Sequence, residues 1–569
     1  MAAQGRCHFA RDYSCAAFGA STLSAPSSAA AAFMLQTMQA EGAGFHQPGI
    51  GYEPVTGMTY DGHPLAYGNG TLYGTPHEFS APSKESLHVA MLARALEGSD
   101  LASAFTGGLN ASLSLLSRKM SAYEQFNASY PGFGCFLPWV SVTSSGLQPI
   151  APGWTHAVPG LDNGEWFWSM MAAAAALDTV GDAALARRYH AWTDCMIANA
   201  RTIFYAGEGK VAAVVQIADP SAPVTPGNYN QTGGGLLDDP YEGETLTVLL
   251  DALTPWTNAS ERELLWSVKR PQLRSVNYVL PSGRAITVQQ GFWFSSHEQW
   301  KTLLLPYFDV DIVRRVFANC ERARTWDGSV TALPGLLASV NDVTNGSESI
   351  PDYVSAAGIQ SIASQTVLRR DLVTPYGAWP VMAHNLTAGL CWYRNMLAAP
   401  RMQGPHGSTE AISVNGTEIS PLTTWDSKVT TLLSMVGGVS DSVRAVLRRL
   451  PDATRRTRSA YDRFTQVMLR ALSTVWRGAV GGVEFAFRPQ PASILIGILG
   501  SVLIALFSMW MVSRRQFRQS ARELLVSAGA VDATPASGLA KRSWSVVVGA
   551  VAIVAAVAIL AFSGQASPG

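Results

Sequence analysis

The chain has 569 residues, of which 47% are hydrophobic and 14% charged, with 41 basic and 41 acidic side chains. A net charge of zero gives no reason to expect a nucleic acid as a partner. The six cysteines show no CxxC spacing, so a zinc ribbon and a thioredoxin motif are excluded, while one or two disulfides of undefined pairing stay open.

The N-terminal residues 1–45 are rich in Ala and Ser. No continuous apolar stretch follows Arg6 and Arg11, so the segment lacks the pattern of a signal peptide, and we expect it to be disordered. Residues 46–438 are expected to form one domain. It begins with a loop layer at 49–82 that is dense in Gly, Pro, Tyr and His.

Apolar residues at helical spacing predict that this domain is mostly helical. The predicted helices cover 83–96, 111–123, 165–178, 183–205, 242–253, 260–268, 298–306, 309–324, 378–397 and 424–436. Short β-branched runs at 211–217 and 285–288 predict small hairpins. Because strands and helices do not alternate, a parallel α/β sheet is not expected. Helices paired in sequence, with polar residues in the long connecting loops, favour a toroid of helix pairs.

A carboxylate on the inward face of a helix start is predicted within 236–250. Asp239 suits the N-cap, Pro240 the first helical position, and Glu242 lies three residues after the cap. Glu242 shares a face with the apolar residues that follow, whereas Glu244 does not. Desolvation raises the pKa of such a carboxyl, so Glu242 is a candidate general acid. Alternatively, Asp239 and Glu242 form a capping box, and the helix dipole lowers the pKa of Glu242.

A second polar cluster lies beside tryptophans at 160–168. Asp162 or Asn163 is expected to cap a helix whose first turn holds Glu165 and Trp168. Polar groups beside indole faces are typical of sugar sites, where hydroxyls are hydrogen-bonded and C–H faces are stacked. The alternative is an ordinary capped helix of the core.

The segment 291–300 contains His297 and Glu298, which resemble the start of a zinc-protease helix. Position 301 is Lys, so the second histidine is missing and zinc is rejected. Ser295 with Glu298 also fits a capping box. We therefore expect no metal and no cofactor here.

A third aromatic segment begins at Tyr376 and Trp379 and continues through His384, Trp392 and Arg394. The arginine either holds a carboxylate in place or satisfies loop carbonyls. Both interpretations stay open from the sequence.

The segment 420–428 offers a second carboxylate. Thr424 is expected to cap a helix with Asp426 in its first turn, where a negative charge is favoured by the helix dipole. Asp426 could serve only that purpose, or it could be a general base kept ionised there. A buried Glu and a solvated Asp hold different protonation states at one pH, as two-carboxylate glycosidases require. No nucleophile elbow, Walker loop or Rossmann fingerprint occurs, so serine-hydrolase, nucleotide-dependent and redox activities have little support.

The last part of the chain changes in composition. Residues 439–490 are rich in Arg and predict basic amphipathic helices that lie near a membrane surface or pack on the domain, or else a plain solvated face. The uncharged stretches 491–513 and 546–562 are expected to be transmembrane helices that contact the lipid bilayer, and the basic loop 514–545 between them is expected in the cytosol. A lipid-anchor signal is the alternative for 546–562.

Eight Asn-x-Ser/Thr sequons end well before these apolar stretches. They lie at Asn69, Asn110, Asn127, Asn230, Asn258, Asn345, Asn385 and Asn415. They predict a glycosylated domain on the extracellular or lumenal side of the membrane, in agreement with the topology inferred from the basic loop.

Several short stretches together resemble the endo-β-1,2-glucanases of glycoside hydrolase family 162, and more distantly family 144. They are Phe79-Ser-Ala-Pro-Ser-Lys-Glu-Ser-Leu-His, Leu161-Asp-Asn-Gly-Glu, Asp239-Pro-Tyr-Glu-Gly-Glu, Ser296-His-Glu-Gln-Trp-Lys, Thr374-Pro-Tyr-Gly-Ala-Trp and Thr424-Trp-Asp-Ser-Lys. The C-terminal membrane segments depart from what is expected of secreted members of the family.

The resemblance implies an (α/α)6 barrel and inverting hydrolysis of internal β-1,2-glucosidic bonds of a β-glucan. It implies Glu242 as the acid, acting through a substrate hydroxyl, and Asp426 as the base, acting through a chain of waters. The predicted substrate-binding residues belong to the motifs above or lie beside them. They are Asp162, Asn163, Glu165, Trp168, Tyr241, Glu244, Trp293, His297, Glu298, Tyr376, Trp379, His384, Trp392, Arg394 and Trp425.

Two other functions stay open. One is a membrane carbohydrate-binding or adhesion protein that kept the barrel without catalysis, and the other is a glucan-remodelling transferase. An inverting enzyme requires Glu242 and Asp426 to face each other at roughly 6.5–9.5 Å, or farther with a longer water relay.

Overall fold

The chain of the computed structural model divides into two units, Met1–Phe485 and Ala486–Gly569. The structure describes residues 16–238, 243–267, 274–291, 299–331, 340–350, 352–354, 358–364, 366–369 and 371–449. All of these belong to the first unit, and the statements below concern them alone.

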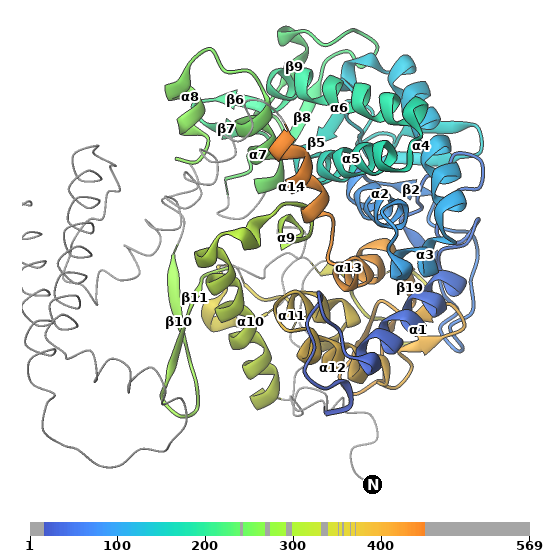
Figure 1. Ribbon diagram of the computed structural model, residues 1–569, viewed down its shortest axis with the longest axis vertical. Helices are drawn as coiled ribbons and strands as arrows, with labels where there is room; N and C mark the ends of the chain where they lie inside the picture. Colours follow the sequence, from blue (N-terminus) through green and yellow to red (C-terminus); the bar gives the residue numbers. More distant parts are fainter. Residues whose placement is uncertain are drawn as a thin grey trace, which may run out of the picture. The chain divides into compact units, whose positions relative to one another are not determined.

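One set of helices is buried on nearly all sides. It comprises α2 (Pro82–Leu96), α5 (Gly160–Val180), α7 (Glu244–Leu253), α9 (Lys301–Leu304), α11 (Trp379–His384) and α13 (Trp425–Met435). Within this set α11 contacts α13, α13 contacts α2, α2 contacts α5, and α5 contacts both α7 and α9 (Figure 1). Small residues allow the close approach: a Cβ on Gly164 of α5 would lie 2.5 Å from the backbone nitrogen of Leu246 in α7.

A second set of helices alternates with the first along the chain. It comprises α1 (Ser28–Gly44), α4 (Leu109–Ser129), α6 (Ala183–Phe204), α8 (Ala259–Leu264), α10 (Asp311–Thr331) and α12 (Leu386–Leu397). The longer ones are amphipathic: α6 buries Leu185, Tyr189, Trp192 and Met196 on one face and exposes the other. Helices of the two sets therefore pair along the chain, each helix of the second set preceding one of the first.

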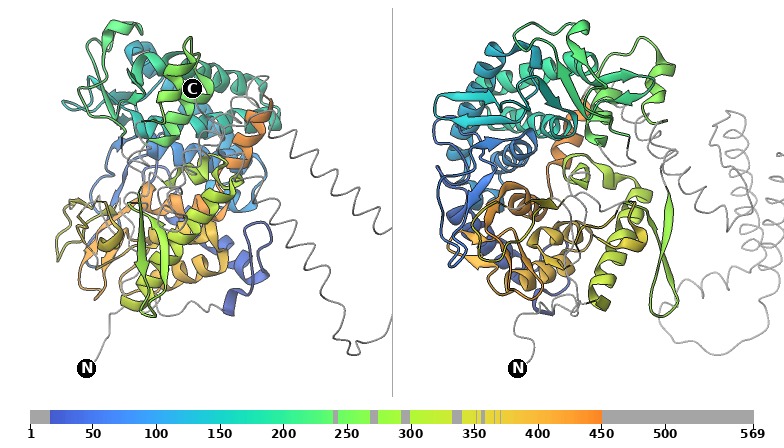
Figure 2. Two further views of the ribbon diagram at one scale, coloured as in Figure 1. Left: turned by 90° about the vertical axis from the view of Figure 1, so that its left-hand side faces the viewer. Right: turned by 180° about the vertical axis from the view of Figure 1, so that it is seen from behind.

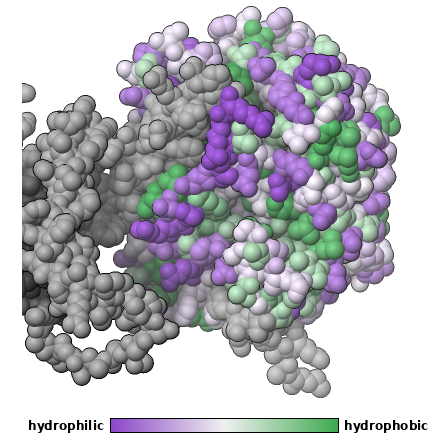
Figure 3. Space-filling model, viewed as in Figure 1, coloured by the Kyte–Doolittle hydropathy of each residue, from purple (hydrophilic) through white to green (hydrophobic). Residues whose placement is uncertain are grey.

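Short helices complete the helical part. They are α3 (Asp100–Thr106), α14 (Ser440–Arg449), and the 3-10 turns η2 (Ala16–Phe18), η3 (Pro131–Phe133), η4 (Pro226–Asn228), η7 (Tyr307–Asp309), η8 (Gln360–Ile362) and η9 (Pro375–Ala378). Hydrophilic side chains gather on the surface over α14 (Figure 3). There Arg444 bonds both Asp309 and Asp441, so at least one arginine of this basic segment packs on the domain.

The strands are short and pair only antiparallel. Three-stranded sheets join β2 (Phe79–Ser80), β3 (Val140–Thr143) and β4 (Gly146–Pro149); β5 (Ala157–Pro159), β8 (Val214–Ile217) and β9 (Tyr229–Asn230); and β14 (Leu372–Val373), β17 (Ala411–Ser413) and β18 (Ile419–Ser420). Pairs join β1 (Gly62–Pro64) to β19 (Leu422–Thr424), β6 (Tyr205–Gly207) to β7 (Lys210–Val211), β10 (Ser275–Val279) to β11 (Ala285–Gln289), β12 (Val340–Asn341) to β13 (Tyr353–Val354), and β15 (Gln403–Gly404) to β16 (Gly407–Ser408). The β10–β11 hairpin extends beyond the helices (Figures 1 and 2).

The expected mostly helical fold without a parallel sheet is confirmed within the described residues. The N-terminal expectation was partly wrong, because α1 forms a helix that Ser27 caps and that buries Met34 and Met38. The predicted helix 378–397 is two helices, since Asn385 ends α11 and caps α12. The run 211–217 is divided between two sheets.

The predicted segments 450–490, 491–513, 514–545 and 546–562 lie outside the described residues, as do residues 1–15. Among the helices that are described, none has the length and apolarity needed to cross a bilayer.

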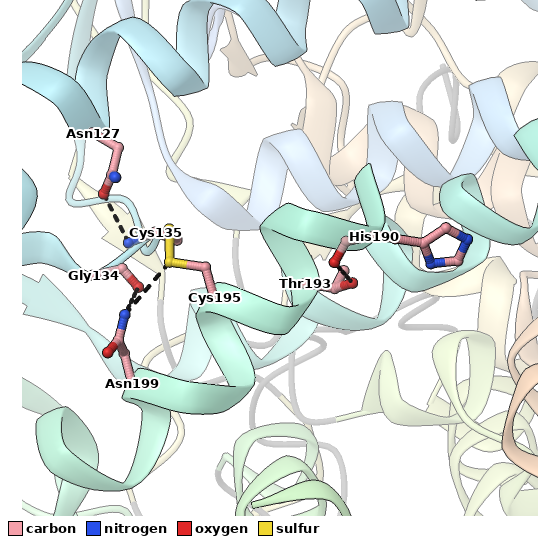
Figure 4. Close-up of a disulfide and its surroundings, with 7 residues drawn as sticks. All are labelled: Asn127, Gly134, Cys135, His190, Thr193, Cys195 and Asn199. Atoms are coloured by element: carbon pink, nitrogen blue, oxygen red, sulfur yellow. Dashed lines mark hydrogen bonds between the residues drawn. A yellow bond between two sulfur atoms is a disulfide. The ribbon is translucent and has the colours of Figure 1, made fainter. Parts of the chain in front are cut away.

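A disulfide joins Cys135, in the loop after η3, to Cys195 of α6 (Figure 4). Asn127 accepts a hydrogen bond from the Cys135 amide at 3.0 Å, and Asn199 donates to the Gly134 carbonyl at 3.2 Å. The two cysteines are 60 residues apart, and the segment between them contains α5 and the first part of α6. Cys320 and Cys391 are buried free thiols.

Candidate functional site

The centre of the candidate site is Asp426, in the first turn of α13. Thr424 occupies the N-cap position, as predicted. We expected this carboxylate to be solvated, but Asp426 is only 4% exposed. Lys84 of α2 donates from Nζ to Asp426 Oδ2 at 2.8 Å, and this contact with the helix start favours a negative charge on Asp426.

Lys84 serves two carboxylates. Its Nζ also lies 3.4 Å from Asp61 Oδ1, and Asp61 Oδ2 lies 3.1 Å from Nδ1 of the partly exposed His77. Burial opposes the charge on Lys84, but Asp426 and Asp61 raise its pKa well above the usual range. The pairing of β1 with β19 brings Asp61 here, since the Trp425 amide donates to the Asp61 carbonyl at 3.2 Å.

A third carboxyl, Glu410, lies with Asp61 and Asp426, and we call these three residues the acidic cluster. It is 2% exposed and directly precedes β17. Thr424 Oγ1 lies 3.2 Å from its Oε1, and Ser420 Oγ lies 3.3 Å from its Oε2. Burial, followed by the nearby charges of Asp61 and Asp426, raises the pKa of Glu410 to about 8.

A row of partly exposed rings continues from this cluster. His77, which contacts Asp61, packs edge-on against Phe79 at a centroid distance of 4.4 Å. Phe79 stacks on Trp139 at 5.6 Å, and Trp139 stacks on Trp154 at 4.8 Å. Trp139 Nε1 also donates to Oδ2 of the predicted site residue Asp162 at 2.8 Å. Aromatic surface beside several carboxylates is the combination used to bind sugars. We call His77, Phe79, Trp139 and Trp154 the aromatic row.

The predicted cluster on α5 differs from expectation in its cap. The helix begins at Gly160, with Pro159 at the N-cap, so neither Asp162 nor Asn163 caps it. The Asn163 side chain instead accepts a hydrogen bond from the Leu137 amide and donates to the carbonyls of Leu137 and Pro159. Its amide therefore anchors the start of α5 to the preceding loop.

Two further predicted residues of α5 lie in the interior. Glu165 is buried, and Trp168 Nε1 donates to the Thr245 carbonyl of α7 at 3.0 Å. The Trp168 ring thus packs between helices, and the prediction that it stacks on a sugar does not fit its position.

The helix predicted from Pro240 begins later. Gly243 takes a left-handed conformation with φ 63°, and α7 starts at Glu244. The facial argument that favoured Glu242 over Glu244 was therefore wrong. Glu244 itself is buried, 2.5 Å from Nζ of Lys301.

Five predicted site residues lie outside the described residues. They are Tyr241, Glu242, Trp293, His297 and Glu298. Their roles stay predictions.

Three more predicted stacking residues are core residues. Trp425 is fully buried, donates to the Gly51 carbonyl at 2.7 Å, and packs on His88 at 4.6 Å. Trp379 is also fully buried, and Trp392 lies under the Arg324 guanidinium at 5.4 Å. Rings enclosed in this way offer no face to a substrate, which corrects the expectation that they form a stacking surface.

The remaining predicted residues are dispersed. Tyr376 is buried in η9, and His384 is exposed at the end of α11. Arg394 lies over the Phe18 ring at 4.9 Å, a cation–π contact that neither sequence interpretation anticipated.

Sequence reasoning missed Lys84, Asp61, Glu410 and the aromatic row beyond Phe79. The sequence pattern does not single out Lys84, because α2 also carries Glu85, His88 and Arg94 and buries nearly every residue. Asp61 and Glu410 gave no local signal, since each reaches the site through strand pairing and loop packing.

Buried carboxylates beside partly exposed aromatic rings, in a mostly helical domain, are features of proteins that act on carbohydrates. A family model described as "Endo-beta-1,2-glucanase SGL" matches residues 58–493. The chain belongs to this endo-β-1,2-glucanase family and is a glycoside hydrolase. No curated protein matches it.

Two similar solved structures are endo-β-1,2-glucanases from Talaromyces funiculosus. One, in complex with sophorose, is 39% identical over 82% of this chain and 94% of that chain, with a TM-score of 0.73. The other, a glutamate-to-glutamine mutant with β-1,2-glucan, is 40% identical over 77% and 89%, with a TM-score of 0.72. An endo-β-1,2-glucanase from Chitinophaga pinensis shares the fold at 13% identity, covering 78% and 98%, with a TM-score of 0.54.

Proposed function

We propose that this protein hydrolyses internal β-1,2-glucosidic bonds of β-glucan with inversion. The observation that carries the proposal is the buried Asp426, held by Lys84 at the start of α13 within the region that matches the family. The relatives solved with sophorose and β-1,2-glucan support this substrate class.

In the proposed reaction Asp426 accepts a proton from a water molecule through further waters. The water oxygen bonds to the anomeric carbon while the glycosidic C–O bond breaks on the opposite face. Glu242 supplies a proton, through a substrate hydroxyl, to the departing oxygen. Lys84 contributes by keeping a negative charge favourable on Asp426 before the water is deprotonated.

The aromatic row would contact sugar units away from the broken bond, since it extends from Asp61 at the acidic cluster. The alternating helices are consistent with a toroid of six helix pairs around this cluster. The partly exposed rings of Trp139 and Trp154 would offer apolar contact to a glucose unit, and Asp162, which Trp139 bonds, would offer a hydrogen-bond acceptor.

We also propose that the enzyme is anchored by 491–513 and 546–562, with the helical domain extracellular or lumenal. The Cys135–Cys195 disulfide supports an oxidising compartment. Seven of the eight sequon asparagines are exposed, and Asn127 is partly exposed. Treatment of the cell-derived protein with an endoglycosidase should increase its gel mobility, and unchanged mobility would remove this support.

The test of the activity is sugar release from linear β-1,2-glucan by purified protein. We expect short oligosaccharides whose initial anomeric form, followed by polarimetry, is inverted. Glu242→Gln and Asp426→Asn should each lose activity by about 10²–10⁴-fold. Glu124→Gln and Asp178→Asn are matched controls, because both side chains are exposed.

Different results would separate the alternatives. Activity that survives in Asp426→Asn alone would move the base to another residue. A folded protein that binds β-1,2-glucan but releases no sugar from it would favour the carbohydrate-binding or adhesion alternative, and products longer than the substrate would favour the transferase.

A further inference from the structure

Glu410 differs in its surroundings from six other buried carboxylates in the described part of the chain. Each of those six faces a cation. The pairs are Glu41 with Lys428, Glu85 with Lys119, Glu244 with Lys301, Asp251 with Arg262, Glu321 with Arg324, and Asp426 with Lys84. Glu410 instead has two hydroxyls and the Asn341 backbone N–H.

The charges around Glu410 are mostly negative. Asp61 and Asp426 are near enough to act on it, and Lys84 is already shared between those two carboxylates. The other titratable groups on the elements packed around it are His63 on β1, Tyr353 on β13, and Lys428 on α13 with its partner Glu41. An ionised Glu410 would be a third buried carboxylate around one ammonium, which is unfavourable in a low-dielectric site.

Glu410 also connects to the start of α13. Its Oε1 lies 3.2 Å from Thr424 Oγ1, which lies 2.8 Å from Ser427 Oγ. These two hydroxyls flank Asp426 in sequence, one at the N-cap and one in the first turn. A protonated Glu410 can donate to one hydroxyl and accept from the other, so the chain of hydrogen bonds has a defined direction.

We propose that Glu410 is a positioning residue that carries a proton at neutral pH and fixes the turn that presents Asp426. Loss of that proton sets the alkaline limit of hydrolysis, because the new carboxylate repels Asp426 and Asp61 and disturbs the hydrogen bonds of Thr424. This inference rests on the proposed role of Asp426 as base.

The first test compares the pH dependence of kcat/KM for wild type and Glu410→Gln. The amide is neutral at every pH and keeps the shape. Wild type should lose activity above pH 8, where the Glu410 pKa lies. At about pH 9 the loss should be about tenfold in wild type and under about twofold in Glu410→Gln. An alkaline limb that is the same in both proteins, with Glu124→Gln as control, would overturn the proposal.

The second test does not use activity. A carboxyl whose pKa rises from 4.5 to about 8 on folding stabilises the fold below pH 4.5, and this stabilisation is lost as pH rises to about 8. The unfolding midpoint of wild type should therefore fall relative to Glu410→Gln between these pH values and run parallel above them. A constant difference would overturn the protonated state even if neither protein released sugar.

A third measurement needs no variant and covers the case in which Glu410→Gln does not fold. Infrared spectra of the wild-type protein should contain a protonated carboxyl C=O band that disappears around pH 8. Absence of any such loss near that pH would contradict the inference.

Discussion

Two buried lysines make the clearest comparison within this molecule. Lys119 of α4 contacts both oxygens of Glu85 at 2.7–2.8 Å, and both side chains are fully buried. Thr59 donates to the same carboxylate, and the Tyr123 hydroxyl bonds it as well. Lys84 directly precedes Glu85 in α2. It is shared by Asp61 and Asp426, and Asp61 contacts the partly exposed His77.

The difference is one of charge balance. In the Lys119 pair one cation meets one anion, and burial lowers the Lys119 pKa to about 8 despite the opposing effect of Glu85. In the Lys84 cluster the carboxylates outnumber the cation, and the Lys84 pKa is raised. A balanced, enclosed pair holds α2 and α4 together, whereas an excess of carboxylates around Lys84 leaves acid–base capacity for a reaction.

The largest effect should come from breaking the balanced pair. Lys119→Met leaves Glu85 buried without its cation and should lower the free energy of unfolding by about 3–5 kcal/mol, measured by urea denaturation. Below its unfolding transition the variant should keep kcat on β-1,2-glucan within about twofold, because the pair takes no part in the reaction. A kcat loss as large as that of an Asp426 variant would show that Lys119 and Lys84 belong to one functional unit. The contrast between a structural pair and a catalytic cluster would then be wrong.

At the Lys84 cluster we expect a smaller effect on the free energy of unfolding than at Lys119, but a larger effect on kcat. Lys84→Met should lower kcat by about 100-fold, about 2.7 kcal/mol, because Asp426 and Asp61 then repel each other without a shared cation. The acid limb of the pH–rate profile should move to higher pH, since the ionised carboxylate loses its partner. The control is Lys210→Met at an exposed pair with Glu208. An unmoved acid limb would show that Lys84 only supports the fold.

The two lysines also show what the sequence can reveal. The long amphipathic helices can be predicted from the sequence, because one buried face imposes a period of 3.6 residues. The pattern predicts 183–205, and α6 is Ala183–Phe204. The position of Asp426 can also be predicted, since the residues around it mark a helix start. In α2, however, nearly every residue is buried, so no stripe separates Lys84 and Glu85 from the apolar positions.

Other features depend on tertiary contacts that no local pattern encodes. The helix start at α7 was misplaced because Gly243 turns the chain in a left-handed conformation, which a cap signal at Asp239 does not anticipate. Asp61 reaches the site through the register that pairs Gly62 with Thr424, where a Cβ on Gly62 would lie 2.3 Å from the Thr423 carbonyl oxygen. Tryptophans were assigned to the sugar because composition does not distinguish an enclosed indole from an open one.

The aromatic row gives the smallest predicted effect. Trp154→Ala removes the last ring of the row and should raise KM about fivefold, about 1 kcal/mol, while kcat stays within about twofold. That combination means the ring binds ground state and transition state alike, as expected for a sugar unit away from the broken bond.

Trp326→Ala is the matched control, because Trp326 is exposed on α10 outside the row. If both variants leave KM unchanged, the row does not bind glucan, and the acidic cluster must hold its substrate by other groups. If Trp154→Ala instead lowers kcat with KM unchanged, the ring acts on the turn that positions Asp162 through Trp139, since its loss would disturb the Trp139 stack and the 2.8 Å hydrogen bond to that carboxylate. The row would then position Asp162 at the start of α5 without touching the sugar.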